Sequence, residues 1–190
     1  GLVMSSVPAD RSAAWGRRFA PRVVTRACDG ARFLHTRLTA LLGRAPIIVG
    51  GMTPTTSFYG HRLVAACANA GFTAELAAGG LPRPHVFRER IARLHSLLEP
   101  GAAIGVNLLF LNQRQWAFQF PLVLELRRQG VPIDGLTVAA GVPSVEKAQE
   151  IVQALRDSGM RYVAFKPGSV DAIRRVIDIA KAIDDFPVIV

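Results

Sequence analysis

The run AIGVNLLF, residues 103–110, is apolar except for Asn107, and it is the stretch that decides the class of fold. Together with Ala102 and Leu111, the run is ten residues long. A helix needs ~20 apolar residues to cross a bilayer, so this run is half the required length. We therefore interpret it as a buried strand. Five similar short runs flank it: PIIVGGM (46–52), FTAELA (72–77), GLTVAA (135–140), RYVAFK (161–166) and FPVIV (186–190).

The centres of these runs are about 25 to 32 residues apart, which is typical of repeated βα units. Apolar strands without clean alternation indicate a parallel sheet that is covered on both faces. Apolar spacing and capping residues predict helices at 58–70, 84–98, 121–129, 144–157 and 169–181. In the last of these helices, we expect Ile173, Val176, Ile177 and Ala180 to face inward.

Two architectures fit this alternation, an open doubly wound sheet and a (β/α)8 TIM barrel. In a barrel, most strands place a functional group at their C-terminal end, whereas an open sheet gathers ligands at one switch point. Glycine or polar residues follow nearly every strand here, as in GGMTPTT (50–56), ELAAGG (75–80), AAGVPS (139–144) and FKPGS (165–169). The sequence therefore predicts an α/β fold, a (β/α)8 barrel.

A complete barrel takes ~250 residues, so we expect residues 45–190 to be the N-terminal part of one, with about six of eight strands. The last strand would otherwise expose an unpaired apolar edge, and we expect the barrel to continue beyond Val190. Residues 1–44 form the preceding segment. A short helix is conceivable at 31–42, but no strand pattern is visible, so we expect a basic irregular lead-in.

Charge and cysteine content exclude several classes of function. Residues 1–44 hold eight Arg against two Asp, a balance of +6, and the remainder of the chain contributes only +3 of the net +9. Basic residues are not interleaved with aromatics, which argues against nucleic-acid binding. Cys28 and Cys67 show no ligand spacing, so we expect no metal site and no disulfide, and a reduced, cytoplasmic chain. No apolar run is long enough to span a membrane.

Polar and glycine residues at the strand ends are the candidate site. Gly50, Gly51, Met52 and Thr53 end the first strand, where glycines allow close approach of a ligand; a plain βα turn is the alternative. Asn107 needs a hydrogen-bond partner inside an apolar strand, either a ligand or a backbone carbonyl.

We expect different roles for the two charged residues Glu75 and Lys166, which lie in or at the end of a predicted strand. Glu75 is interpreted mainly as a structural pairing residue. Lys166, one of three lysines, ends the fifth strand, where an ammonium can stabilise developing negative charge; a solvated lysine is the alternative. None of the four histidines has triad or metal spacing, and no nucleotide-binding glycine motif is present. The residues alone thus predict a ligand at a barrel mouth and no particular reaction.

Five motifs in order carry a family resemblance: GRAPIIVGGMTPTT (43–56), AELAAGG (74–80), GVNLLFLN (105–112), GLTVAAGVPSVE (135–146) and AFKPGSVDAI (164–173). They resemble the enoyl reductase domain of type I fatty acid synthases, found in fungal β subunits and single-chain bacterial synthases and related to nitronate monooxygenases. The run RRFAPRVV (17–24) is similar to the lead-in that follows the acetyltransferase region of those synthases.

The resemblance implies an FMN-dependent barrel that reduces trans-2-enoyl chains on acyl carrier protein with NADPH. By matching positions, Met52 and Thr53 correspond to flavin contacts of the first strand and Asn107 to that of the third. Lys166 corresponds to the basic group near the pyrimidine edge of the flavin and is the candidate catalytic residue. Gly51 and Gly141 match by position only.

The resemblance also implies partners, and it leaves other functions open. The implied partners are acyl carrier protein and other synthase domains in a large homo- or hetero-oligomer. The family's next motif, a glycine-rich run ending in histidines, would begin just past Val190, so these 190 residues lack part of the implied site. The alternatives are a free-standing nitronate monooxygenase-like flavoprotein and a non-catalytic structural segment of a megasynthase.

Overall fold

The structure is a computed structural model, and it describes residues 9–190. Internal contacts divide the chain into two compact units, with the boundary between Pro46 and Ile47. Each unit is described by itself below.

The N-terminal unit contains a β-hairpin between two helices. Its elements are α1 (Ala9–Phe19), β1 (Arg22–Thr25), β2 (Arg32–His35) and α2 (Arg37–Leu42). β1 and β2 pair antiparallel, with Arg22 opposite His35 and Thr25 opposite Arg32. The expectation of an irregular lead-in without strands is therefore wrong for this part of the segment. Every residue of both strands is exposed, and a strand with no buried face has no alternating pattern to reveal it.

Local side-chain hydrogen bonds define the turns of this unit. Asp29 accepts from the backbone nitrogen of Ala31 at 3.0 Å and from Arg26 Nε at 2.9 Å, which closes the hairpin turn. These two donors hold the pKa of the Asp29 carboxyl at about 2, below its usual value. The α2 helix begins at a capping box formed by Thr36 and Thr39 and ends at Gly43 in the left-handed conformation.

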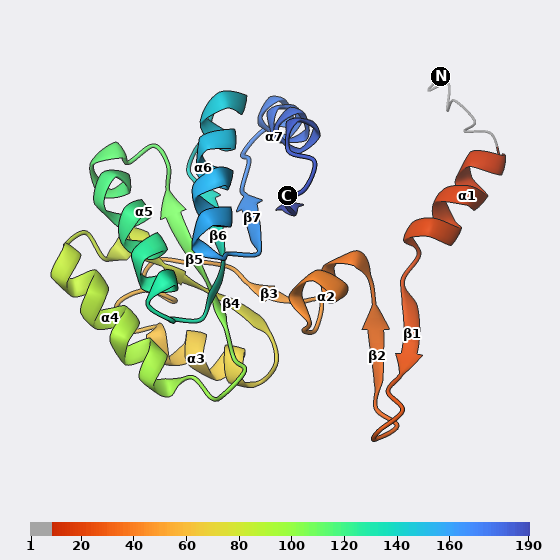
Figure 1. Ribbon diagram of the computed structural model, residues 1–190, viewed down its shortest axis with the longest axis horizontal. Helices are drawn as coiled ribbons and strands as arrows, with labels where there is room; N and C mark the ends of the chain where they lie inside the picture. Colours follow the sequence, from red (N-terminus) through yellow and green to blue (C-terminus); the bar gives the residue numbers. More distant parts are fainter. Residues whose placement is uncertain (1–8) are drawn as a thin grey trace. The chain divides into compact units, whose positions relative to one another are not determined.

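The C-terminal unit is built on a six-stranded parallel sheet whose strands follow one another in sequence order (Figure 1). The strands are β3 (Ile48–Val49), β4 (Thr73–Ala77), β5 (Ile104–Leu109), β6 (Ile133–Ala139), β7 (Tyr162–Phe165) and β8 (Val188–Ile189). Each lies within one of the six predicted runs, except that β6 begins two residues earlier. Sequential parallel pairing with a helix in each connection is the topology of a barrel and not of an open sheet with a switch point.

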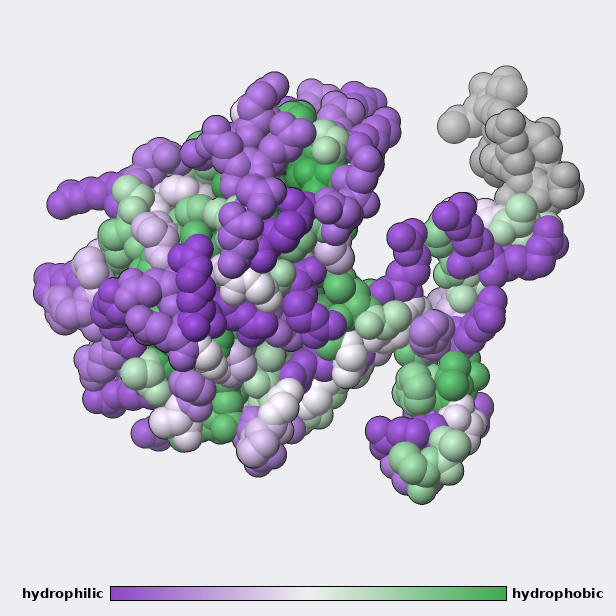
Figure 2. All heavy atoms as spheres, in the orientation of Figure 1, coloured by the Kyte–Doolittle hydropathy of each residue, from purple (hydrophilic) through white to green (hydrophobic). Residues whose placement is uncertain are grey.

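One helix follows each of the first five strands of this unit, with a short turn of 3-10 helix after the second. The helical elements are α3 (His61–Asn69), η1 (Ala78–Gly80), α4 (Pro84–Leu97), α5 (Gln113–Arg128), α6 (Val145–Ser158) and α7 (Val170–Ala182). Ser144 and Ser169 cap α6 and α7 by accepting from backbone nitrogens. Figure 2 shows that the visible surface of these helices is mainly hydrophilic, as amphipathic helices around a sheet require.

Two helices differ from the sequence-based expectation. α5 begins at Gln113 and contains Pro121, whereas a start at Pro121 was predicted. In α7 the buried residues are Ala172, Val176 and Ile179, while Ile173 and Ile177 are 41% and 43% exposed. The inward face of α7 is therefore displaced from the predicted one, because isoleucine at a helix flank gives the same periodic signal as isoleucine at its centre.

The two faces of the curled sheet differ in chemistry. Side chains on the face that packs against the helices are large and apolar: Leu76, Val106, Leu108, Leu136, Val138, Val163 and Phe165. The alternate positions are mainly small or polar: Thr73, Glu75, Ala77, Gly105, Asn107, Gly135, Thr137, Ala139, Tyr162 and Ala164. A curled parallel sheet with helices outside and this second set inside is consistent with an incomplete TIM-like barrel, as predicted.

Candidate functional site

The turn after β3 is a compact loop fixed by Thr56. Its hydroxyl accepts from the backbone nitrogen of Met52 at 2.8 Å, and its own backbone nitrogen donates to Met52 O at 2.7 Å. Thr56 is fully buried, and its carbonyl accepts from Ala77 at the end of β4. Met52 is 49% exposed and Thr53 is also exposed, so both candidate residues are accessible in this loop.

Glu75 is the centre of a buried hydrogen-bond network inside the sheet. Its Oε2 accepts from the backbone nitrogen of Gly51 at 2.8 Å and from Asn107 Nδ2 at 3.2 Å. Its Oε1 accepts from Thr137 Oγ1 at 2.5 Å. Glu75 is 5% exposed, so the network ties the ends of four neighbouring strands together away from water. The structural pairing expected for Glu75 is what the structure shows.

Asn107 lies in this network directly beneath Gly51. A Cβ at position 51 would stand 2.7 Å from the Cβ of Asn107, so only glycine fits there. The partner of the Asn107 amide nitrogen is thus a carboxylate, and not the backbone carbonyl considered from sequence. Asn107 is 4% exposed and pairs with Ala77 and Thr137 in the ladders.

Tyr162 occupies the interior of the sheet next to the network. Cβ atoms built at Gly135 and Gly105 would lie 2.3 Å and 3.1 Å from its ring and hydroxyl. Two glycines within strands therefore make room for one aromatic ring. Thr137 and Tyr162 were not predicted from the sequence as members of this interior cluster. The signal that could have indicated them is glycine inside an apolar strand, at positions 105 and 135, where a large side chain from a neighbouring strand can pack against the backbone.

The loops after β4 and β6 are held in place by different contacts. Gln119 of α5 is fully buried, and its Nε2 donates to the carbonyls of Ala78 and Leu81, which fixes the turn at η1. After β6, Gly141 adopts φ +117°, and a Cβ there would meet Leu111 at 2.8 Å. Gly141 thus packs against the loop after β5, and the structure gives it a conformational role at the strand ends.

Lys166 follows the last residue of β7 and is exposed. Its backbone nitrogen extends the ladder by donating to Val138 O at 3.2 Å. Because side chains alternate along a strand, Lys166 belongs to the same face as Tyr162, the interior face that carries the Glu75 network. Among the candidates, the structure brings Gly51 and Asn107 into contact, whereas Gly141 and Lys166 stand at the ends of other strands.

A separate group of charged residues surrounds the start of α3. His61 is 6% exposed and its Nδ1 donates to Phe58 O at 3.2 Å. Burial lowers the pKa of His61, the hydrogen bond to Phe58 opposes that shift, and the positive charges of Arg90, Arg62 and Arg93 lower the pKa further. The lowered pKa favours the neutral form of His61 beside these three arginines.

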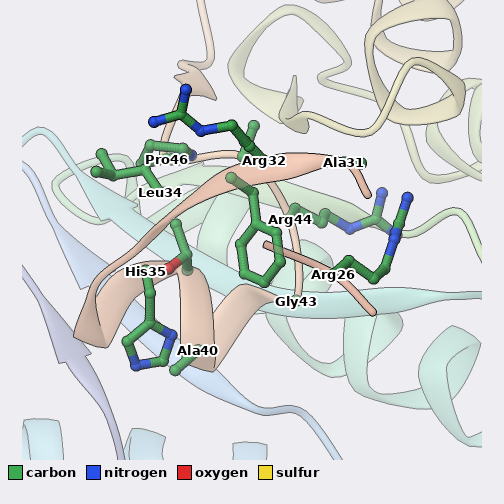
Figure 3. Close-up of a pocket in the computed structure, with 12 residues that line it drawn as sticks. Arg26, Ala31, Arg32, Leu34, His35, Ala40, Gly43, Arg44 and Pro46 are labelled. Atoms are coloured by element: carbon green, nitrogen blue, oxygen red, sulfur yellow. The ribbon is translucent and has the colours of Figure 1, made fainter. Parts of the chain in front are cut away.

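A hollow of about 690 Å³ lies in the N-terminal unit. Figure 3 shows that its wall includes Arg32 and Leu34 from β2 and Ala40 from α2. Arg26, which also lines it, is engaged by Asp29. Its lining offers arginine and histidine side chains without a buried polar cluster, so we do not place the candidate site there.

Across residues 9–190, no group of three His, Cys, Asp or Glu side chains is arranged to hold a metal ion. Cys28 and Cys67 are both free thiols. In that same part of the chain, no helix combines the length and apolar character needed to cross a membrane.

Known proteins are similar to this chain over nearly its whole length. The chain is 42% identical over 175 residues to the fatty acid synthase subunit beta of Schizosaccharomyces pombe, and 41% identical over 174 residues to that of Saccharomyces cerevisiae. It is 43% identical over 182 residues to fatty acid synthase 2 of Mycosarcoma maydis. The chain is a homologue of part of a fatty acid synthase beta subunit.

The similarity covers 92% to 96% of this chain but only 5% to 8% of each of these relatives. The chain thus spans less than a tenth of the length of the synthase subunits that it matches. No protein-family model matches the chain. The homology is therefore to one segment of these larger synthase subunits.

Proposed function

We propose that this segment is the N-terminal part of an FMN-dependent enoyl reductase barrel within a fatty acid synthase. The reaction would be reduction of a trans-2-enoyl chain on acyl carrier protein to the saturated chain, with NADPH as the reductant. The observation that carries the proposal is the cluster at the C-terminal ends of the first strands, where Gly51 lies against Asn107 and Met52 and Thr53 are exposed. Barrel enzymes place their cofactors at this end.

The residues present fit a flavin at this end of the sheet. The glycine at position 51 makes room for the side chain of Asn107, and the Glu75 network fixes Asn107 and the Gly51 nitrogen in one orientation. Asn107 Nδ2 donates to Glu75, so the carboxamide oxygen of Asn107 is the atom that would accept from a ring N–H of the cofactor. Met52 offers an apolar surface, and Thr53 a hydroxyl, for the rest of the ring system.

When bound next to Met52, Thr53 and Asn107, FMN would supply the hydride-transfer chemistry for reduction of the enoyl thioester by NADPH, with a proton from the solvent or an acid group completing the saturated chain. Lys166 is a cation at the end of β7, and its charge would stabilise negative charge that develops during reduction. The Glu75 network has a positioning role, because rigid neighbours keep Asn107 and the turn after β3 in a single arrangement. The acyl carrier protein, other synthase domains and a large cytoplasmic assembly are the partners and setting of this proposal.

Absorption spectroscopy and a coupled assay test the proposal in the full-length protein. We expect a bound yellow flavin that NADPH bleaches under anaerobic conditions and that a trans-2-enoyl thioester reoxidises. A flavin that a nitronate reduces and oxygen reoxidises, and that the enoyl thioester does not reoxidise, would assign the segment to the nitronate monooxygenase type. A protein without flavin, in which Gly51→Ala leaves synthase activity unchanged, would assign it a structural role.

A further inference from the structure

Arg90 of α4 is a buried cation with no anionic partner among the described residues. Its side chain is 5% exposed, and its guanidinium carbon lies 3.8 Å from the centre of the Phe58 ring. Its Nε is buried and has no hydrogen-bond partner within residues 9–190. The guanidinium therefore offers its donors to whatever occupies the space beside it.

Burial of such a group has a clear physical meaning. Arginine stays protonated in proteins, so a buried guanidinium cannot relieve its cost by losing the charge. Contact with an aromatic face compensates for only part of the lost hydration. Buried charges in proteins are generally paired with an opposite charge, which indicates that an anion belongs next to Arg90.

The space beside Arg90 is a pocket of about 550 Å³ between the start of α3 and the middle of α4. Arg62 and Arg93 also line it, and the one acidic residue in its wall, Glu89, lies 2.7 Å from Arg93 in an ion pair. Three arginines against one glutamate leave the wall with a net charge of +2. Neutral His61 does not change this balance.

The N-terminus of α3 opens at this pocket and adds a second source of positive potential. The helix begins at His61, a lining residue, and its N-cap Gly60 provides no side-chain cap. A helix end without a side-chain cap leaves backbone N–H donors for a ligand, and its dipole favours negative charge. Guanidinium forks and helix N-termini are the two groups that proteins most often turn toward phosphate oxygens.

We propose that the pocket between α3 and α4 is a binding site for a phosphate group, held by Arg90, Arg62 and Arg93. A phosphate dianion balances the +2 charge of the wall and supplies enough oxygens for more than one guanidinium. A pocket of about 550 Å³ has room for a phosphate group together with an organic group that it carries. The exposed ring of Tyr59 at its edge can stack on an organic group that the phosphate carries. This site lies outside the strand ends and does not depend on the function proposed above.

Hydrogen exchange resolved by mass spectrometry tests the site in the full-length protein, because it localises protection to single helices. In buffer without phosphate, addition of millimolar inorganic phosphate should slow exchange in peptides covering 58–70 and 84–98 several-fold, since a ligand of the folded state opposes opening. Adenosine monophosphate forms a second arm. Tighter binding of the nucleotide, abolished by Tyr59→Ala, would assign the site to a monoester; equal binding would assign it to phosphate itself.

Arg90→Met is the decisive variant, because methionine keeps an apolar stem and removes the charge. It should remove the protection by phosphate while the two helices remain at least as stable in phosphate-free buffer. The matched control is Arg175→Met on the exposed side of α7, which should keep the full response. The proposal fails if sodium chloride at equal ionic strength gives the same protection, or if Arg90→Met responds like the wild type. It also fails if a glutamate-rich peptide protects these helices and phosphate cannot displace it.

Discussion

Glu75 Oε2 lies 2.8 Å from the backbone nitrogen of Gly51, so a side chain of β4, the second strand of the parallel sheet, holds the turn that follows β3, the first. The same carboxylate accepts from Asn107 and Thr137 on the next two strands. One buried side chain therefore sets the relative positions of the backbone groups that we propose as a cofactor site. A change at Glu75 should therefore alter the geometry of the proposed site, although the carboxylate is buried and does not belong to the exposed part of that site.

Glu75→Gln should weaken the sheet near its C-terminal ends. Glutamine has a single acceptor oxygen, so at least one of the three donors on Gly51, Asn107 and Thr137 loses its partner. A buried donor without a partner costs about 1–3 kcal/mol. The opening free energy from native-state hydrogen exchange in β4 to β6 should fall by this amount, whereas Glu150→Gln, in an exposed ion pair with Lys147, should change little. Equal changes for both variants would contradict the network.

Gly135→Ala should destabilise the protein through the ring of Tyr162. The new methyl group would meet ring carbons at 2.3 Å, which forces the ring to move and costs about 1–3 kcal/mol. Gly168→Ala is the control, since nothing stands within 4 Å of a Cβ there. Combining Gly135→Ala with Tyr162→Ala should give less than the sum of the two single losses in unfolding free energy. Additive losses would show that the two positions do not interact.

Lys166→Met tests the role of the cation at the end of β7. If the proposed function holds, loss of the charge lowers the reduction potential of the flavin and slows its reduction by NADPH by roughly 10²-fold, comparable to deletion of one electrostatic stabiliser. Stopped-flow absorbance of the full-length protein measures both effects. Lys147→Met and Lys181→Met, on exposed helix positions, should be near wild type. Equally small effects for all three would make Lys166 an ordinary surface lysine.

The acid sensitivity of α3 should depend on His61. Because its pKa is lowered in the folded protein, the unfolded chain takes up a proton first as the pH falls through the usual value of 6.5. Stability is therefore constant above that value and declines below it, down to the lowered pKa. Arg62, Arg90 and Arg93 face the ring as fixed cations, and Glu89 is paired with Arg93.

The measurement is the exchange rate of α3 amides between pH 7 and 5, corrected for intrinsic exchange, in phosphate-free buffer. His61→Gln should flatten the pH dependence of α3 stability. His95→Gln, at an exposed position of α4, should leave the dependence unchanged. The same slope in wild type and His61→Gln would assign the acid sensitivity to another group.

Elements with a strong local pattern could be predicted from the sequence. Runs of β-branched residues located all six parallel strands, and capping serines with glycine stops located the helices to within a few residues, as at Ser144 and Gly159. Pro121 misled the prediction for α5, because proline favours a first turn but is also tolerated where the surrounding helix is held by packing.

Elements whose signal comes from distant partners could not be predicted. The hairpin of β1 and β2 has no buried face, so its residues show no alternation. The interior cluster is joined across sequence separations of 24 to 62 residues, from Gly51 to Glu75 and from Glu75 to Thr137. The residues next to Thr137 and Tyr162 in the sequence do not indicate which strand each side chain will contact.

The sequence by itself thus determined the order of strands and helices, the division between a basic leading part and an apolar remainder, and the polar residues at strand ends. Tertiary structure alone decided that Glu75 would bind Gly51, that Tyr162 would fill the space over Gly135, and that Arg90 would be buried against Phe58. The physical reason is that periodicity and capping act within one turn or one strand. Hydrogen bonds and packing inside the sheet depend instead on register between strands, which only the folded chain fixes.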